Sequence, residues 1–263
     1  MQTILKKIIE VKKIEIRKAK SILSLKDLKQ KVNNQKIVTR DFKSALTKKG
    51  QITCIGELKI ASPSKGFLNK NLNLAKTAKI YEKEGINAIS VLTDMHFKGK
   101  LSDLRLVKDQ VNIPILRKDF IIEDYQVYES LFHGADAILL IGAVLSKKLL
   151  GELLGLTHQL KMNAIIEVHT PDDLEKIDFS AARIIGINNR NLKDFSVDLK
   201  RTKQLCLSIP ARIRTISESG INCRADMLYL KKLKINSVLI GEGIVRAKNI
   251  PLKIRELLGK KIC

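Results

Sequence analysis

Glu57 and Lys59 stand two residues apart in a segment that otherwise resembles a buried strand. The segment, "IGELKIASPSKG" at residues 55–66, is mostly apolar up to Ala61. On a strand, residues two apart project from the same face, so the two side chains would lie side by side. Burying a carboxylate and an ammonium costs free energy unless they pair well or serve a reaction. The spacing therefore predicts either an acid and base couple or a structural ion pair.

Polar side chains also stand where the other apolar runs end. Eight strand-sized runs rich in Ile, Val and Leu lie at residues 52–58, 88–93, 113–117, 136–141, 163–168, 183–187, 212–217 and 237–241. The polar residues at or just after their ends are Thr93, Asp94, Lys118, Asp119, Glu167, His169, Asn188, Asn189, Arg190, Glu218, Ser219 and Glu242, with glycines at Gly220 and Gly241. Such a collection predicts a polar site at one end of a sheet.

Two of these residues suit proton transfer. We expect Lys118 and Glu167 to face each other as general acid and base. A lysine buried among other cations has a lowered pKa, which suits a proton donor near neutral pH. We interpret Asp119 and Glu218 as groups that orient their neighbours, and His169 as a supporting histidine rather than a catalyst. Glycines after the last two runs fit a phosphate cradle built from backbone N–H groups.

Segments with helical periodicity separate the apolar runs. Residues 74–85 and 125–134 end in glycine, and "TPDDLEKI" at residues 170–177 begins with a capping threonine followed by proline. Alternating strands and helices, eight of each, predict an α/β fold, a (β/α)₈ TIM barrel with its active site at the carboxyl ends of the strands. A doubly wound open sheet is the alternative, but the chain has no GxGxxG after its first strand.

The first fifty residues differ from the rest because they are basic and helical. They predict an N-terminal helical extension at 1–50 before a barrel at 51–263, within a single domain spanning 1–263. Its first helix would be amphipathic, with Thr3 as N-cap and Ile4, Ile8 and Val11 on one face. The mixture of Lys, Glu and Ile does not resemble a signal peptide.

The composition limits the possible partners. The formal net charge is +22, a surplus that can attract nucleic acid, anionic membranes or anionic small molecules. The lysines are spread along the chain and aromatic residues make up 4%, so a solvated basic surface is the favoured interpretation over nucleic-acid binding. No apolar stretch is long enough to cross a bilayer. The four cysteines lack metal-ligand spacing, which predicts free thiols in a cytoplasmic protein without a metal site.

Several motifs together resemble one family, indole-3-glycerol-phosphate synthase. They cover nearly the whole chain and are "TILKKIIEVKKIEI" (3–16), "RDFKSAL" (40–46), "ELKIASPSKG" (57–66), "VLTDMHFKG" (91–99), "LRKDFIIEDYQ" (116–126), "ADAILLI" (135–141), "EVH" (167–169), "GINNRNL" (186–192), "SESGI" (217–221) and "LIGEGIVRA" (239–247). The resemblance implies a carboxy-lyase of L-tryptophan biosynthesis that uses no metal or organic cofactor. Its small anionic substrate would be 1-(2-carboxyphenylamino)-1-deoxyribulose 5-phosphate, whose indole ring closes with loss of CO₂ and water.

The resemblance also implies roles for single residues. Lys118 would be the general acid, and Lys59, also in the catalytic set, would hold the substrate carboxylate and take part in proton transfer. Glu167 would be the base or would stabilise the developing iminium charge, with Glu57 as a second acid/base candidate, and which of the two serves dehydration stays open. The implied substrate-binding residues are Ser62, Phe97, Phe120, Asn188 and Arg190, and the implied phosphate-binding residues are Ser219, Gly220 and Gly241.

The chain departs from the family pattern after Gly241. Many members carry a hydroxyl residue where this chain has Glu242 and Gly243. Because a carboxylate facing the phosphate would repel it, we expect Glu242 to turn away. The alternative enzymes are sister phosphate-binding barrels such as phosphoribosylanthranilate isomerase. These require a cysteine or aspartate acid/base pair, which the Glu-x-Lys at 57–59 and the Arg-Lys-Asp-Phe at 117–120 do not fit. We expect a monomer, with a weak dimer as the alternative.

Overall fold

The computed structural model describes residues 4–48, 50–63, 65–191 and 195–261 of the chain. Thr3, the expected N-cap, and Ser64, in the turn after the first strand, lie outside these ranges. Among the helices within them, none is both long and apolar enough to cross a membrane.

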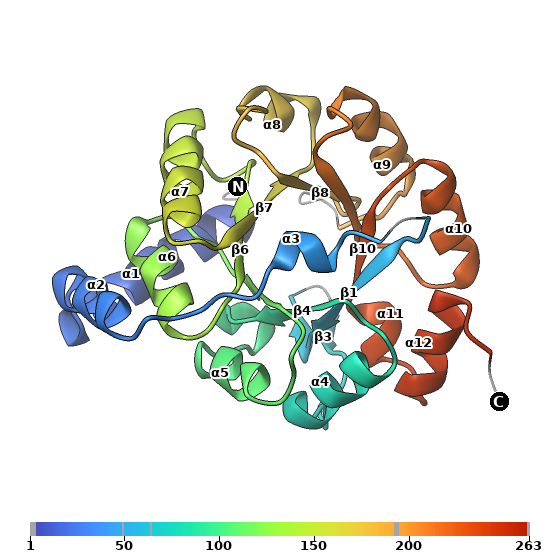
Figure 1. Cartoon of the computed structure of the whole chain (residues 1–263), viewed down its shortest axis with the longest axis horizontal. Helices are drawn as coiled ribbons and strands as arrows, with labels where there is room; N and C mark the ends of the chain where they lie inside the picture. Colours follow the sequence, from blue (N-terminus) through green and yellow to red (C-terminus); the bar gives the residue numbers. More distant parts are fainter. Residues whose placement is uncertain (1–3, 49, 64, 192–194, 262–263) are drawn as a thin grey trace.

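Eight parallel strands close into a barrel (Figure 1). They are β1 (Thr53–Leu58), β4 (Ala88–Leu92), β5 (Ile115–Lys118), β6 (Ala137–Ile141), β7 (Asn163–Val168), β8 (Ile184–Asn188), β9 (Arg214–Glu218) and β10 (Ser237–Ile240). Each strand pairs with its neighbour in sequence, and β1 completes the ring by pairing with both β4 and β10. The TIM barrel prediction is confirmed, and each predicted run overlaps one strand. The carboxyl ends of all eight strands therefore meet at one mouth.

Helices form the outer ring around these strands (Figure 1). They are α4 (Leu74–Lys83), α5 (Ser102–Lys108), α6 (Asp124–Phe132), α7 (Lys147–Gln159), α8 (Pro171–Glu175), α9 (Lys200–Leu205), α10 (Arg224–Lys232), α11 (Glu242–Val245) and α12 (Ile250–Leu258), with 3-10 turns η1 (Met95–Phe97) and η2 (Cys206–Ser208). The predicted glycine stops are confirmed, since Gly85 and Gly134 follow α4 and α6 with φ of +91°. Thr170 caps α8 as predicted. The sequence did not single out α5 or α9, and neither begins at a residue whose side chain makes a capping hydrogen bond.

The N-terminal segment wraps the barrel and plugs one end of it. Helices α1 (Ile4–Ile22) and α2 (Leu25–Asn34) pack against α6 on the outside. Helix α3 (Phe42–Ala45) crosses the end where the strands begin (Figure 1). Phe42 and Leu46 are buried among the residues that point into the barrel. Because these side chains fill that end of the barrel, an open pocket can form only at the opposite end, where the strands finish.

A short antiparallel hairpin leaves the mouth after β1. Its strands are β2 (Ala61–Ser62) and β3 (Gly66–Phe67), and β2 contacts η1 of the next loop. The sequence did not predict this hairpin, because two-residue strands carry no periodic pattern.

Candidate active site

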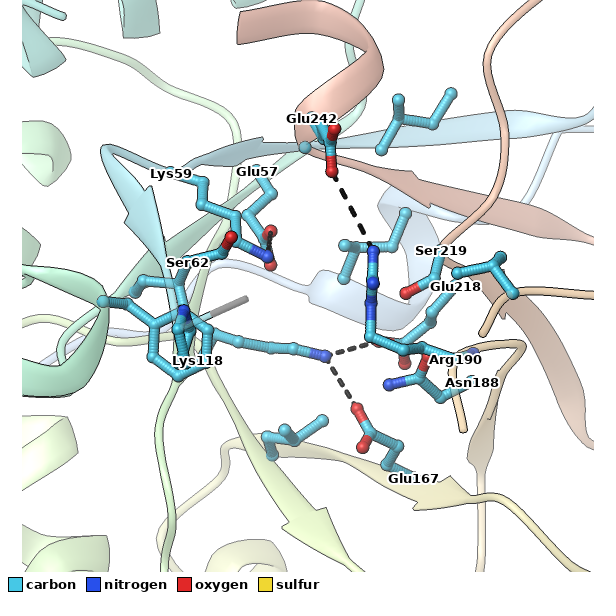
Figure 2. A pocket seen from close by; sticks show the side chains of 18 of the residues that line it. Glu57, Lys59, Ser62, Lys118, Glu167, Asn188, Arg190, Glu218, Ser219 and Glu242 are labelled. Atoms are coloured by element: carbon cyan, nitrogen blue, oxygen red, sulfur yellow. Dashed lines mark hydrogen bonds and ion pairs between the residues drawn. The ribbon is translucent and has the colours of Figure 1, made fainter. Parts of the chain in front are cut away.

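A cavity of about 400 Å³ opens at the carboxyl ends of the strands. Its lining includes every residue that the sequence assigned to the site: Glu57, Lys59, Ser62, Phe97, Lys118, Phe120, Glu167, Asn188, Arg190, Ser219, Gly220 and Gly241. Figure 2 shows ten of the lining side chains by name, with those of Lys118 and Glu167 reaching toward one another. The fold thus brings together residues that are spread over most of the chain.

Lys118 lies at the centre of the pocket between two carboxylates. Its Nζ is 2.8 Å from Oε2 of Glu167, and it also donates to Oε2 of Glu218 (Figure 2). Burial alone would lower the pKa of Lys118, but Glu167, Glu218 and Glu57 together raise it well above its usual value. The expectation of a lysine with a lowered pKa is therefore wrong, because the neighbours that surround Lys118 are acids rather than cations.

The two carboxylates that share this ammonium differ in charge state. Burial would raise the pKa of Glu167, but Lys118 and a hydrogen bond from Asn188 bring it down to about 2. For Glu218, burial and the nearby Glu167 outweigh Lys118 and raise the pKa to about 7. Its second oxygen, Oε1, has no hydrogen-bond partner among the described residues. At neutral pH, Glu167 is therefore ionised, whereas Glu218 is partly protonated.

Glu218 was missing from the predicted catalytic set. The sequence placed it at a strand end, which was the available signal, but gave it only an orienting role. What distinguishes it is its place across the barrel from β5, beside Lys118, and this follows from the closed strand order rather than from any local motif.

Glu57, in β1, and Lys59, just after it, form one wall of the pocket. Lys59 Nζ lies 3.7 Å from Oε1 of Glu57 and 5.3 Å from the centre of the Phe97 ring. Gly241 leaves room for this carboxylate, since a Cβ there would come within 2.5 Å of Oε1 of Glu57. The Lys59 ammonium therefore lies within cation–π distance of the Phe97 ring at the wall of the pocket.

Asn188 and Arg190 extend from the end of β8. Asn188 Oδ1 accepts the backbone N–H of Arg190 at 3.0 Å, which fixes the turn between them. The Arg190 guanidinium donates to the carbonyl of Phe195 at 3.2 Å and points across the mouth (Figure 2). It therefore supplies a positive charge to the pocket opposite Lys59.

The loop after β9 has an unusual backbone. Ser219 and Gly220 are both left-handed, with φ of +68° and +83°. A side chain at Gly220 would also meet Val197, whose Cγ1 would lie 2.5 Å from the new Cβ. This conformation brings the backbone of the loop to the edge of the pocket.

Glu242 does not turn away from the pocket as expected. Its Oε1 accepts from Lys65 at 2.6 Å and from Arg246 at 3.0 Å, and its Oε2 lies 3.9 Å from Arg190 (Figure 2). Burial alone would raise the pKa of Glu242, but the hydrogen bonds from Lys65 and Arg246 lower it. Three cations therefore compensate this carboxylate at the edge of the pocket.

Within the described ranges, no group of His, Cys, Asp and Glu side chains could hold a metal ion. His169 lies behind Glu167, with Nε2 at 3.4 Å from Oε1, and burial lowers its pKa.

Comparisons with a family model and with known proteins point to the same family. The family model described as indole-3-glycerol phosphate synthase matches residues 5–257. Among relatives with that name, the protein of Acetivibrio thermocellus is 45% identical over 96% of this chain and 98% of its own length. That of Caldanaerobacter subterraneus is 44% identical over 92% of this chain and 93% of its own length.

Solved structures match the fold at low identity. The 3-hexulose-6-phosphate synthase of Salmonella typhimurium aligns with a TM-score of 0.61 and 11% identity, over 79% of this chain and 97% of its own. A chain of the tryptophan synthase complex of Pyrococcus furiosus aligns with a TM-score of 0.59 and 14% identity, over 79% and 98%. These likenesses concern the barrel, whereas the match over residues 5–257 and the relatives above 40% identity concern the family. The chain belongs to the indole-3-glycerol phosphate synthase family.

Proposed function

We propose that this pocket is where the chain closes the indole ring of its substrate, with Lys118 as the general acid. The activity of the family, formation of indole-3-glycerol phosphate in tryptophan biosynthesis, is the activity of this chain. The substrate is a phosphorylated anion, and the reaction releases CO₂ and water. The observation that carries the residue assignment is the Lys118 ammonium, held between Glu167 and Glu218 at the centre of the cavity.

Ring closure needs a proton at one point and negative charge at another. As the aromatic carbon attacks the ketone carbon, the ketone oxygen gains electrons and the aniline nitrogen becomes an iminium. Lys118 donates its proton to that oxygen, and the ionised Glu167 carboxylate stabilises the positive charge. Glu218, with a pKa of about 7, can return a proton to the lysine amine through their hydrogen bond.

Decarboxylation and dehydration complete the reaction. Lys59 holds the substrate carboxylate until its carbon–carbon bond breaks, and the bond electrons then neutralise the iminium. Lys118, reprotonated by Glu218, protonates the new hydroxyl, which leaves as water, and a carboxylate base removes a proton from the adjacent carbon of the new ring. We assign this base to Glu167, because its pKa of about 2 keeps it ionised, and we keep Glu57 as the second acid/base group beside Lys59.

The rest of the pocket orients the substrate. Phe97 and Phe120 form apolar walls around the anthranilate ring, while Asn188 and Arg190 bind its polar edge, and Ser62 contributes from the hairpin. At the phosphate end, the backbone of Ser219, Gly220 and Gly241 receives the phosphate. The left-handed backbone of the first two supports this, since it turns the loop toward the pocket.

We propose further that the chain acts as a monomer in the cytoplasm and does not bind nucleic acid. The even spread of its lysines supports this part of the proposal. We also propose that residues 1–263 form one domain, with a helical extension at 1–50 and a barrel at 51–263. The burial of Phe42, from the extension, among side chains inside the barrel supports a single domain.

Glu167→Gln and Glu57→Gln test the assignment of the base. We expect Glu167→Gln to lower kcat about a hundredfold or more and to accumulate a decarboxylated species that still holds its hydroxyl, because the base for dehydration is lost. We expect Glu57→Gln to lower kcat by a smaller factor. Single-turnover quenching with mass spectrometry of the products measures both. The opposite ranking, with the intermediate accumulating in Glu57→Gln, would assign the step to Glu57.

A further inference from the structure

Lys12, on the N-terminal helix α1, is buried among carboxylates. Its Nζ lies 2.8 Å from Asp119 Oδ1, 2.9 Å from Asp94 Oδ2 and 2.7 Å from Glu15 Oε2. The residue is 4% exposed, and Asp94 and Asp119 are also buried. Burial alone would lower the pKa of Lys12, but Asp119 and Asp94 raise it, so the ammonium stays charged. The neighbouring Lys13 faces solvent and pairs with Glu10 on the same helix.

The two aspartates follow the strands that carry the site. Asp119 comes directly after Lys118, and its Oδ2 accepts from Thr93 and Arg117 while its Oδ1 accepts the backbone N–H of Phe120. Asp94 begins the η1 turn that carries Phe97, and its Oδ1 accepts the backbone N–H of His96.

The two aspartates depend on Lys12 to different degrees. Asp119 keeps a second buried cation, Arg117, at 2.9 Å. Asp94 has an ion pair only with Lys12 and His96 among the described residues, and the latter counts as a cation only when protonated. Loss of Lys12 would therefore leave Asp94 as the uncompensated charge, next to a mouth that must accept an anionic substrate.

Helix α1 also contributes apolar lining. Leu5 and Ile8, about two turns and one turn before Lys12, line the cavity. Because α1 lies outside the strand order of the barrel, only its own contacts fix its position over the mouth. The ion pairs of Lys12 are cross-links from this helix to the loops after β4 and β5.

We propose that Lys12 is a positioning residue for substrate binding. It seats α1 so that Leu5 and Ile8 close the apolar side of the pocket, and it neutralises Asp94 beside the anion-binding mouth. This inference rests on the proposed function, in that the cavity is taken as the substrate site.

Lys12→Met and the control Lys13→Met test the proposal. Each removes one lysine and one trypsin site from the same helix. For Lys12→Met we expect KM to rise about tenfold or more with less than about a fivefold fall in kcat, and trypsin to cleave α1 faster than in wild type. For Lys13→Met we expect wild-type KM and cleavage. A folded Lys12→Met enzyme with KM and α1 cleavage within about twofold of the control would overturn the proposal.

The double variant Lys12→Met/Asp94→Asn separates charge from general destabilisation. The introduced amide would keep a carbonyl oxygen for the backbone N–H of His96 but would remove the uncompensated charge. We expect it to recover KM to within about threefold of wild type, and it can be tested even if the single variant does not fold. A double variant with KM raised as far as in Lys12→Met would contradict the role in neutralisation. The trypsin readout needs no turnover, so an inactive wild type would count against the proposed function and not against the seating of α1.

Discussion

Three acidic residues near Lys118 show how one cation is shared in a buried site. Glu167 and Glu218 both accept hydrogen bonds from Lys118, and Glu57 raises its pKa from further away. Burial and the neighbouring Glu167 raise the pKa of Glu218 to about 7, since one ammonium cannot neutralise every carboxylate, while Lys118 lowers the pKa of Glu167 to about 2. In the proposed mechanism, these opposite pKa shifts divide the acid and base roles between similar side chains.

Glu218→Gln should change how stability depends on pH. Because the folded-state pKa of Glu218 is about 7, above the ordinary value of 4.5, the folded protein binds more protons than the unfolded chain between these values. The contribution of Glu218 to the free energy of unfolding therefore decreases as pH rises from about 5 to 8. The Glu218→Gln variant lacks this decrease. We expect the unfolding free energy of the variant, relative to wild type, to increase with pH by up to about 3 kcal/mol.

Urea denaturation at intervals between pH 5 and 8 measures this difference. Glu152→Gln, an exposed position on α7, serves as the control and should follow wild type at every pH. A Glu218→Gln curve parallel to that of wild type would show that Glu218 is ionised throughout.

The elements of the fold follow local signals to different extents. Strands could be predicted because a parallel barrel buries them on both faces and leaves continuous apolar runs. The capped helix α8 and the glycine stops after α4 and α6 could be predicted because their signals are also local. The position of α1 could not, because the buried partners of Lys12 lie far along the chain and nothing near Lys12 distinguishes it from the exposed Lys13.

Asp136 ties the N-terminal extension to the barrel, and its loss should cost stability without affecting chemistry. The buried carboxylate accepts the backbone N–H groups of Arg40 at 2.6 Å and Ile115 at 2.8 Å, and it pairs with Lys108. Asp136→Ala leaves two donors and a partly buried cation without their acceptor. We expect the unfolding free energy to fall by roughly 3 kcal/mol while kcat at 25 °C stays near wild type.

Urea titration and steady-state kinetics on the same preparation check both expectations for Asp136→Ala. Glu152→Ala on the surface should shift stability by less than about 0.5 kcal/mol. An Asp136→Ala enzyme with a wild-type free energy of unfolding, or a folded one that has lost activity, would contradict a purely structural role for Asp136 at the closed end of the barrel.

The molecule as a whole combines a defined arrangement of paired charges inside with a large excess of positive charge overall. That the polar residues at the strand ends line one pocket could be predicted, because a closed barrel gathers its strand ends, wherever they occur in the sequence. Their charge states could not, because they depend on neighbours across the mouth such as Glu218 and Lys118. The net charge of the chain, in contrast, can be counted directly as +22.

This net charge predicts how salt affects stability. Like charges on a compact protein repel one another, and added salt shortens the range of that repulsion. We expect the unfolding free energy in urea to increase by about 1 kcal/mol when NaCl is raised from about 20 to 300 mM. Stability that falls over this range would mean that the ion pairs of the folded state outweigh its net repulsion.

Turnover by wild type and Lys118→Ala, measured side by side, tests the central assignment most directly. The substrate is 1-(2-carboxyphenylamino)-1-deoxyribulose 5-phosphate, and fluorescence of the newly formed indole follows the reaction. Lys148→Ala, at a residue whose side chain is 88% exposed, is the matched control. We expect indole from wild type and the control, and a rate lower by about a thousandfold from a folded Lys118→Ala barrel. A folded Lys118→Ala enzyme that retains a near-normal rate would contradict the role of Lys118 as the general acid.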